Sequence, residues 1–373
     1  MNCLSLKFGM QKSSKVSACP RCDMFGYTEE KIRDFLKKHT KDGVPTVTER
    51  QHYIPVHYLE AWRTGRKIAA KIGKNEPKMV GLRDAAVKSW CYEFAPLSLV
   101  ELETIIDCAK PNFEYERKML SMLIAVSVIP QLAGRIANNI NDDEAKLMLN
   151  TIQSHGLLIP EAKKLFNIRY VATESNPDLA NKGFELLRKE GGERYMTGLE
   201  NSAWPYLKKV RDGHIGFLRE AKSGIRLIEY IFLQMFRTPK LDAAFNNAAA
   251  GTEFSPDYAE HMIPYFRFIF AVKTTCEAIA HFENFEFRLV RNSSGCCFIT
   301  SDYPFVHLDK KSFYEFLFPV SPKIALYMGR KGSMKELYPY LVSPDRNAII
   351  SINSELQKTA VNQTFACTCQ ELQ

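Results

Sequence analysis

The chain has 373 residues, of which 46% are hydrophobic and 25% are charged, and this composition excludes a protein that is disordered along most of its length. Lysine and arginine number 50 against 42 aspartate and glutamate residues, so the formal net charge is +8. This basic surplus is compatible with a nucleic acid or another anionic partner, but it is too small to identify one.

The apolar stretches are too short for a membrane span. The longest candidate, 119–133, is interrupted by Ser121, Ser127 and Pro130 and falls short of the roughly 20 residues that a spanning helix needs. The first residues are also too polar for the apolar segment of a signal peptide. We therefore predict no membrane partner and a cytoplasmic protein whose ten cysteines are reduced.

Residues 1–48 differ in composition from the rest of the chain. They are rich in lysine, serine and helix breakers, and only 28–39 shows the apolar spacing of a helix. We interpret 1–48 as a basic N-terminal extension that is partly ordered. The remainder, 49–373, is predicted to be a single helical domain that ends in a small sheet and a closing helix.

The spacing of apolar residues is mainly helical from about 78 to 284. Within 98–109, for example, Leu99, Leu102 and Ile106 recur on one helix face. The predicted helices after the extension are 98–109, 114–137, 142–155, 160–166, 177–190, 196–211, 215–236, 239–249 and 255–284, and the tracts at 176–178 and 191–192 are interpreted as breaks between them.

The apolar period then changes to two. We predict that 285–291 pairs with 296–301 as a hairpin around the turn 292–295, and that 314–321 and 323–329 form two further strands. A last helix is expected at about 352–365. The predicted fold is therefore α+β and predominantly α-helical, a helical body with one small antiparallel sheet at about 285–330.

Four cysteines raise the question of a zinc site. Cys19 and Cys22 are spaced like one half of such a site, because thiolates separated by two residues can share a tetrahedral ion. Cys367 and Cys369 complete four ligands only if the two ends of the chain meet. Free thiols on the extension are the preferred interpretation, and a structural zinc is kept as the alternative.

Four polar residues stand out from apolar surroundings. His52 lies among aromatic residues, Glu200 precedes an aromatic helix face, Arg237 ends an apolar helix, and Asp302 follows a predicted strand. Carboxylates where a strand ends, and a histidine or arginine beside them, are typical of catalytic and metal-binding sites. Each also has a structural interpretation: Arg237 as a helix cap, Asp302 as a turn residue and His52 as a core histidine.

Five motifs occur in a recognisable order. They are QHYIPVHYLEAW (51–62), LQMFRTPKL (233–241), FITSDYPF (298–305), FPVSPKIAL (318–326) and INSELQKTAVNQTF (352–365). The ordered set resembles a widespread microbial and fungal family that is known as domain-of-unknown-function family 4238. The resemblance covers about 51–365 and leaves the extension outside.

The resemblance places His52, Glu200, Arg237 and Asp302 on the polar positions of the family's motifs. Two positions depart from the family pattern: Gln51 stands where the family has the first histidine of a pair, and Tyr303 stands where it has asparagine. Both changes remove a potential ligand. The family has no established activity, so the resemblance implies a fold rather than a reaction.

Three functions remain open. The first is a hydrolase of nucleic acid or another phosphodiester, with a metal-assisted effector of microbial defence as one form of it. In this hypothesis His52 acts as a general base or metal ligand, and Glu200 and Asp302 hold a divalent metal ion. Arg237 then binds a phosphate. The second is a non-catalytic binding or scaffold protein in which the same residues form a buried polar network. The third is a toxin-like protein regulated by a protein partner that docks on 1–48. The sequence lacks the common phosphate-loop, dinucleotide, zincin and α/β-hydrolase motifs.

Overall fold

The computed structural model describes residues 40–41, 44–45, 50–89, 91–138, 141–157, 177–249, 256–309 and 312–373. The chain forms two compact units, one of 1–47 with 94–191 and one of 48–93 with 192–373. The predicted helices at 28–39 and 160–166, and the Cys19–Cys22 pair, lie outside the described residues. The domain boundary near residue 48 stays a prediction.

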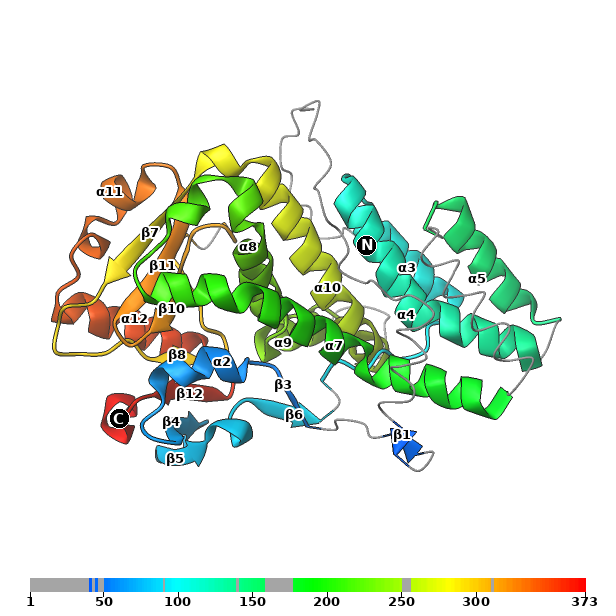
Figure 1. Cartoon of the computed structure of the whole chain (residues 1–373), viewed down its shortest axis with the longest axis horizontal. Helices are drawn as coiled ribbons and strands as arrows, with labels where there is room; N and C mark the ends of the chain where they lie inside the picture. Colours follow the sequence, from blue (N-terminus) through cyan, green and yellow to red (C-terminus); the bar gives the residue numbers. More distant parts are fainter. Residues whose placement is uncertain are drawn as a thin grey trace. The chain divides into compact units, whose positions relative to one another are not determined.

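The described helices that lie wholly in the first unit are α3 (Leu99–Ala109), α4 (Glu114–Asn138) and α5 (Asp143–Ser154), and β1 (Thr40–Lys41) and β2 (Val44–Pro45) form a short pair of strands there. Figure 1 shows α3, α4 and α5 side by side. Ser98 begins α3 with a capping box, in which its side chain and that of Glu101 satisfy each other's backbone N–H groups. Asp142 caps α5 by accepting the N–H of Ala145 and also accepts two hydrogen bonds from Arg135 of α4.

The helical part of the second unit comes after α7 (Pro177–Arg211) in the chain. It consists of α8 (Ala221–Phe236), α9 (Pro239–Ala249) and α10 (Pro256–Ala280), and α10 packs on both others (Figure 1). Nearly every residue in the second half of α8 is buried, because this helix is apolar on all sides there.

Two four-stranded antiparallel sheets complete the second unit. The first has the order β7 (Phe285–Arg291), β11 (Ile324–Arg330), β10 (Phe316–Ser321) and β9 (Val306–His307). The second has the order β5 (Lys78–Gly81), β4 (Lys67–Ile72), β12 (Gln363–Ala366) and β8 (Thr300–Ser301). A separate two-stranded sheet joins β3 (Arg50–His52) to β6 (Val87–Ser89).

The remaining described helices of the second unit are mostly short and lie between or beside these elements. They are α2 (Val56–Leu59), η1 (Glu60–Trp62), η2 (Leu82–Asp84), η3 (Gly216–Arg219), η4 (Phe282–Asn284), α11 (Ser333–Leu337), η5 (Pro339–Leu341), α12 (Arg346–Thr359) and η6 (Cys369–Leu372). One apolar cluster takes side chains from both large sheets and from α12, including Ala69, Val290, Phe298, Leu317, Ile352 and Ala366. The two sheets and α12 therefore share one core.

The mixed α+β fold class is confirmed, but the prediction of one small C-terminal sheet is wrong. The second large sheet contains β4 and β5 from the start of the unit and β12 from its end, and Figure 1 shows the red β12 beside the blue β4. β5 and β6 also occupy part of the region that was predicted to be helical. The pairing of β4 with β12 joins residues almost 300 positions apart, which no local pattern can indicate.

The predicted hairpin between 285–291 and 296–301 is also wrong, because β7 pairs with β11. The side chain of Asn292 explains the difference. Its amide nitrogen donates to the carbonyl oxygens of Cys296 and Pro322, and its oxygen accepts from Ser294. These bonds fold 292–296 into a loop that leaves the sheet, so that only Thr300 and Ser301 form a strand, beside β12.

The closing helix ends earlier than predicted, at Thr359, and the following residues form β12. By contrast, the two helices predicted at 177–190 and 196–211 are the single helix α7. Gly192 inside it serves close packing: a Cβ atom there would lie 2.7 Å from the Tyr92 Cβ and 2.7 Å from its carbonyl oxygen.

No helix among the described residues combines the length and the apolar character that crossing a bilayer requires.

Two glycine substitutions in α7 test this packing. We expect Gly192→Ala to lower the free energy of unfolding by about 1–3 kcal/mol, because the new methyl group overlaps Tyr92. Gly198→Ala is the matched control, since nothing lies within 4 Å of its Cβ position. Alanine there should raise the stability by up to about 1 kcal/mol through helix propensity. Urea unfolding followed by circular dichroism measures both, and a loss of the same size in both variants would contradict the explanation.

Candidate functional site

Arg237 follows the last residue of α8, and its guanidinium group is the centre of a buried polar cluster. Nη1 donates to Glu200 Oε1 of α7 at 2.6 Å, Nε donates to the carbonyl oxygen of Tyr53 at 2.7 Å, and Nη2 donates to that of His52 at 2.9 Å. The side chain is only 2% exposed. Arg237 therefore ties the chain that leaves β3 to both α7 and α8.

The charge of Arg237 is kept in this interior by its neighbours. Burial alone would lower the pKa of Arg237, but the nearby Tyr92 and Glu200 outweigh it and raise that pKa above its usual value. The guanidinium also lies over the ring of Tyr92, 5.7 Å from the ring centroid. Because all three nitrogens already donate to protein acceptors, the predicted role of steadying a phosphate has little support in this geometry.

His52 joins this cluster through its backbone, and its ring is only partly buried. The ring Nδ1 lies 3.2 Å from the carbonyl oxygen of Ala85, which selects the tautomer that carries a proton on Nδ1. Burial lowers the pKa of His52, and the charge of Arg237 lowers it further. The imidazole is therefore neutral near pH 7, with the lone pair on Nε2.

The carboxylate of Asp302 is hydrogen-bonded to another part of the chain than Arg237. Its carboxylate is buried and accepts backbone N–H groups from Val361, Asn362 and Gln363, at 2.9, 2.6 and 3.0 Å. Burial raises the pKa of Asp302, and these three hydrogen bonds offset part of that rise. The carboxylate turns the chain from α12 into β12, which explains the early end of the closing helix.

Tyr92 and Arg267 belong to the same polar interior, and the sequence interpretation missed both. The Tyr92 N–H donates to Gln51 Oε1 at 2.9 Å, and its hydroxyl donates to the His52 carbonyl at 3.0 Å. Arg267 lies 5.8 Å from the Tyr92 ring centroid and donates to both carboxylate oxygens of Asp242. One signal could have found Arg267: it is a lone charge in the apolar stretch of α10. Gln51 is a buried structural acceptor here.

The predicted metal ligands do not gather. Among the residues that the structure describes, no three His, Cys, Asp or Glu side chains are placed to share a metal ion, so His52, Glu200 and Asp302 do not form such a set. Burial raises the pKa of the Cys367 thiol to about 11. Cys369 is half-buried, and Cys19 and Cys22 lie outside the described residues, so the four-cysteine zinc site stays a prediction.

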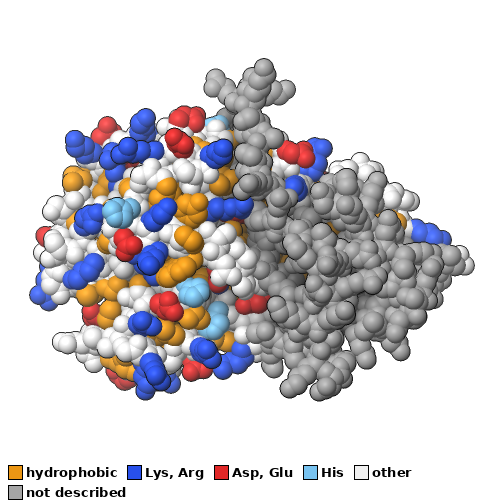
Figure 2. Space-filling model, in the orientation of Figure 1, with side chains coloured by type: hydrophobic (Ala, Val, Ile, Leu, Met, Phe, Trp, Pro, Cys, Tyr) orange, Lys and Arg blue, Asp and Glu red, His pale blue; other side chains and the backbone are white. Residues whose placement is uncertain are grey.

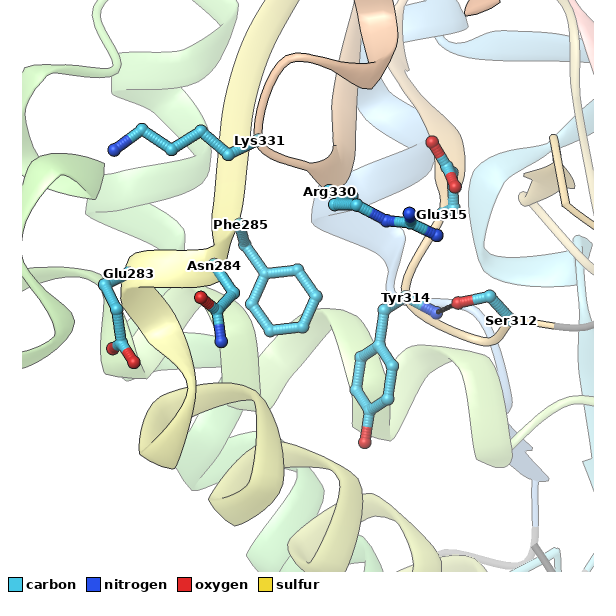
Figure 3. Close-up of a pocket in the computed structure, with 8 residues that line it drawn as sticks. All are labelled: Glu283, Asn284, Phe285, Ser312, Tyr314, Glu315, Arg330 and Lys331. Atoms are coloured by element: carbon cyan, nitrogen blue, oxygen red, sulfur yellow. Dashed lines mark hydrogen bonds between the residues drawn. The ribbon is translucent and has the colours of Figure 1, made fainter. Parts of the chain in front are cut away.

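A pocket of about 460 Å³ lies elsewhere in the second unit, between the end of β11 and the start of β7. Figure 3 shows the rings of Phe285 and Tyr314 near each other, with the Arg330 side chain beside them and Lys331 directed away. The two ring centroids are 5.3 Å apart. Glu283, Asn284, Ser312 and Glu315 complete the lining.

Of the charged residues around this pocket, Glu315 has hydrogen-bond partners within the protein, whereas Arg330 forms no described ion pair. Glu315 is buried, and its Oε1 accepts from the hydroxyls of Tyr327 and Ser333 at 3.0 and 2.7 Å. Arg330 is exposed, and no described carboxylate forms an ion pair with it. On the face shown in Figure 2, basic side chains are interspersed with acidic and apolar ones, so the net charge is not gathered in one basic patch there.

The Arg237 cluster predicts a large loss of stability when one partner is removed. We expect Arg237→Met to lower the free energy of unfolding by about 3–5 kcal/mol, because Glu200 and two backbone carbonyls lose their donor in the interior. Lys358→Met is the control: its ion pair with Glu355 is 66% and 47% exposed, and its loss should cost less than about 1 kcal/mol. Chemical unfolding measures the difference, and equal small losses would show that Arg237 is not a structural centre.

Comparison with curated proteins and with solved structures gave no match. A family model described as a protein of unknown function, DUF4238, matches residues 188–369. This range includes Glu200, Arg237 and Asp302, as well as the whole pocket. This match supports, over residues 188–369, the family of proteins of unknown function that the ordered motifs indicated.

Proposed function

We propose that the protein is a binding protein for single-stranded nucleic acid and that one nucleotide occupies the pocket of Phe285, Tyr314 and Arg330. The observation that carries the proposal is the combination of two neighbouring aromatic rings with an unpaired arginine in one pocket. Nucleic acid is then the partner, and His52, Glu200, Arg237 and Asp302 have a structural role rather than a catalytic one.

The aromatic rings supply the first part of the recognition. A base stacks on phenylalanine or tyrosine through its π face, and such stacking contributes about 1–3 kcal/mol for each base. Only an unstacked base can enter, which favours a single strand over a duplex. The Tyr314 hydroxyl donates to Glu277 Oε2 at 2.8 Å, so this ring is held in one orientation before any ligand binds.

The charged groups supply the second part. Arg330 can donate two parallel hydrogen bonds to a phosphate because no described carboxylate competes for it. Glu283 and Glu315 also line the pocket, and a carboxylate can accept the amino or imino N–H of a base. A phosphate near Arg330 and a base near the carboxylates is therefore the arrangement that balances the charges.

Fluorescence anisotropy with labelled DNA and RNA oligonucleotides tests this function. Phe285→Leu keeps an apolar side chain but removes the π face, and we expect it to weaken binding by about 5-fold to 100-fold. Arg330→Gln should weaken binding and reduce the slope of log affinity against log salt concentration by about 0.7. Tyr314→Phe keeps the ring but loses the hydroxyl that fixes its orientation, so we expect it to weaken binding less than Phe285→Leu does.

The exposed residue Arg63, which does not line the pocket, provides a charge-matched control. Arg63→Gln removes the same charge as Arg330→Gln and should change the affinity little. Binding of duplex and single strands with equal affinity would contradict the proposal, as would equal losses in the two arginine variants. Competition by a free mononucleotide identifies the pocket as a site for one nucleotide.

Hydrolysis of a phosphodiester, the activity predicted from the sequence, is the second proposal. It is favoured by one observation: the imidazole of His52 is partly exposed and its Nδ1 is held by the carbonyl oxygen of Ala85, which leaves the Nε2 lone pair to act as a general base. Arg237 and Asp302 are then positioning residues, because their polar groups contact the protein itself. A role as a defence effector would follow only from such an activity.

A nuclease assay with Mg²⁺, Mn²⁺ or Zn²⁺ separates catalysis from structure. We expect His52→Ala to lose about 100-fold or more of any cleavage rate with little change in melting temperature. Asp302→Ala should lower the melting temperature by several degrees, because three buried N–H groups lose their acceptor. Equal cleavage by the original protein and His52→Ala would rule out the assignment. The docking of a regulatory protein on 1–48 stays a prediction, since most of that segment lies outside the described residues.

A further inference from the structure

The consecutive residues Glu283, Asn284 and Phe285 bring a carboxylate, an amide and an aromatic ring to the same pocket. They lie where the short helix η4 ends and β7 begins. The backbone of Asn284 is held on both sides: its N–H donates to the carbonyl oxygen of His281 at 3.0 Å, and its carbonyl oxygen accepts from the N–H of Lys331 at 2.9 Å. The side chains of this segment therefore extend from a fixed backbone.

The two polar side chains of the segment are available to a ligand. Glu283 and Asn284 are exposed, and no described residue forms a hydrogen bond or an ion pair with either side chain. Figure 3 shows both side chains pointing the same way from the chain, with the Phe285 ring beside Asn284. Glu315, the other carboxylate of the pocket, already accepts two hydroxyl groups. Glu283 is thus the carboxylate that is left for a ligand.

We propose that the pocket reads guanine, and that Glu283 and Asn284 determine this choice of base. The inference rests on the proposed function, because it names the base that the pocket holds. The Watson–Crick edge of guanine presents the acceptor O6 followed by two donors, N1–H and N2–H. Asn284 supplies a donor for O6 and an acceptor for N1–H, and Glu283 supplies an acceptor for N2–H.

The other bases match these groups less well. Adenine and cytosine place a ring nitrogen with a lone pair beside their amino group, where guanine has N1–H, and uracil and thymine offer one N–H between two carbonyl oxygens. A carboxylate repels these lone pairs, whereas its hydrogen bonds to N–H groups are stronger than those of a neutral acceptor. Guanine, stacked on Phe285 with its phosphate at Arg330, is therefore the base that satisfies Glu283 and Asn284 together.

Fluorescence anisotropy of the full-length protein tests the choice of base. The probes are labelled polyuridine strands that carry one central guanosine, inosine, adenosine or cytidine. Inosine differs from guanosine only in lacking the 2-amino group, so the ratio of these two affinities reports the contact with N2–H. We expect the guanosine strand to bind about 5-fold to 100-fold more tightly than the inosine strand. The adenosine and cytidine strands should bind no more tightly than the inosine strand.

Three variants assign the contacts to residues. Glu283→Gln keeps the shape of the side chain and removes its charge, so the ratio of guanosine to inosine affinity should fall towards one. Asn284→Ala should weaken the binding of both strands together, because both bases carry O6 and N1–H. Glu76 is an exposed glutamate that does not line the pocket, and Glu76→Gln should leave the ratio unchanged. Circular dichroism shows whether the variants are folded.

The outcomes separate this inference from the function on which it rests. Equal affinities of the original protein for the guanosine and inosine strands would overturn the guanine assignment, and an unchanged ratio in Glu283→Gln would overturn the role of Glu283. If the strands bind, and Phe285→Leu weakens them all, but no base is preferred, only the choice of base is wrong. If no strand binds, the nucleic-acid function itself is contradicted, and the guanine assignment is overturned with it.

Discussion

The guanidinium group of Arg237 is the interaction on which the second unit depends. It is a permanent charge in a nearly dry interior, so each of its nitrogens must find an acceptor, and a missing acceptor would cost several kcal/mol. Glu200 and the carbonyls of His52 and Tyr53 supply these acceptors. These hydrogen bonds hold two helices and the segment after β3 in one arrangement. Most polar groups of the residues that resembled a catalytic set therefore bind other parts of the protein.

The polar residues that stabilise the fold are therefore different from those that are free to contact a ligand. Arg237, Asp302 and Gln51 are buried, and their polar atoms contact backbone groups or, for Arg237, also the carboxylate of Glu200. Arg330 is different, because it is exposed and lines a pocket together with Phe285 and Tyr314.

The sequence predicted helices well where an apolar stripe and a cap coincide. α9 has the predicted bounds, and α3, α4 and α5 differ from theirs by only a residue or so at either end. The errors occurred where a distant partner decides. Gly192 suggested a helix break, but it is the point where α7 approaches Tyr92. The tail was predicted to be helical to 365, but Asp302 and β4 convert its last part into a strand.

The sequence by itself therefore determined the α+β class, most helices, the resemblance to the family and the four polar residues that matter for the second unit. These follow from local periodicity and from residue types that are costly to bury. Only the tertiary structure decided which strands pair, and that three of the four residues meet around one guanidinium while Asp302 caps a turn. The partner of a strand and the hydrogen-bond acceptors of a buried charge are far away in the sequence, so local patterns cannot predict them.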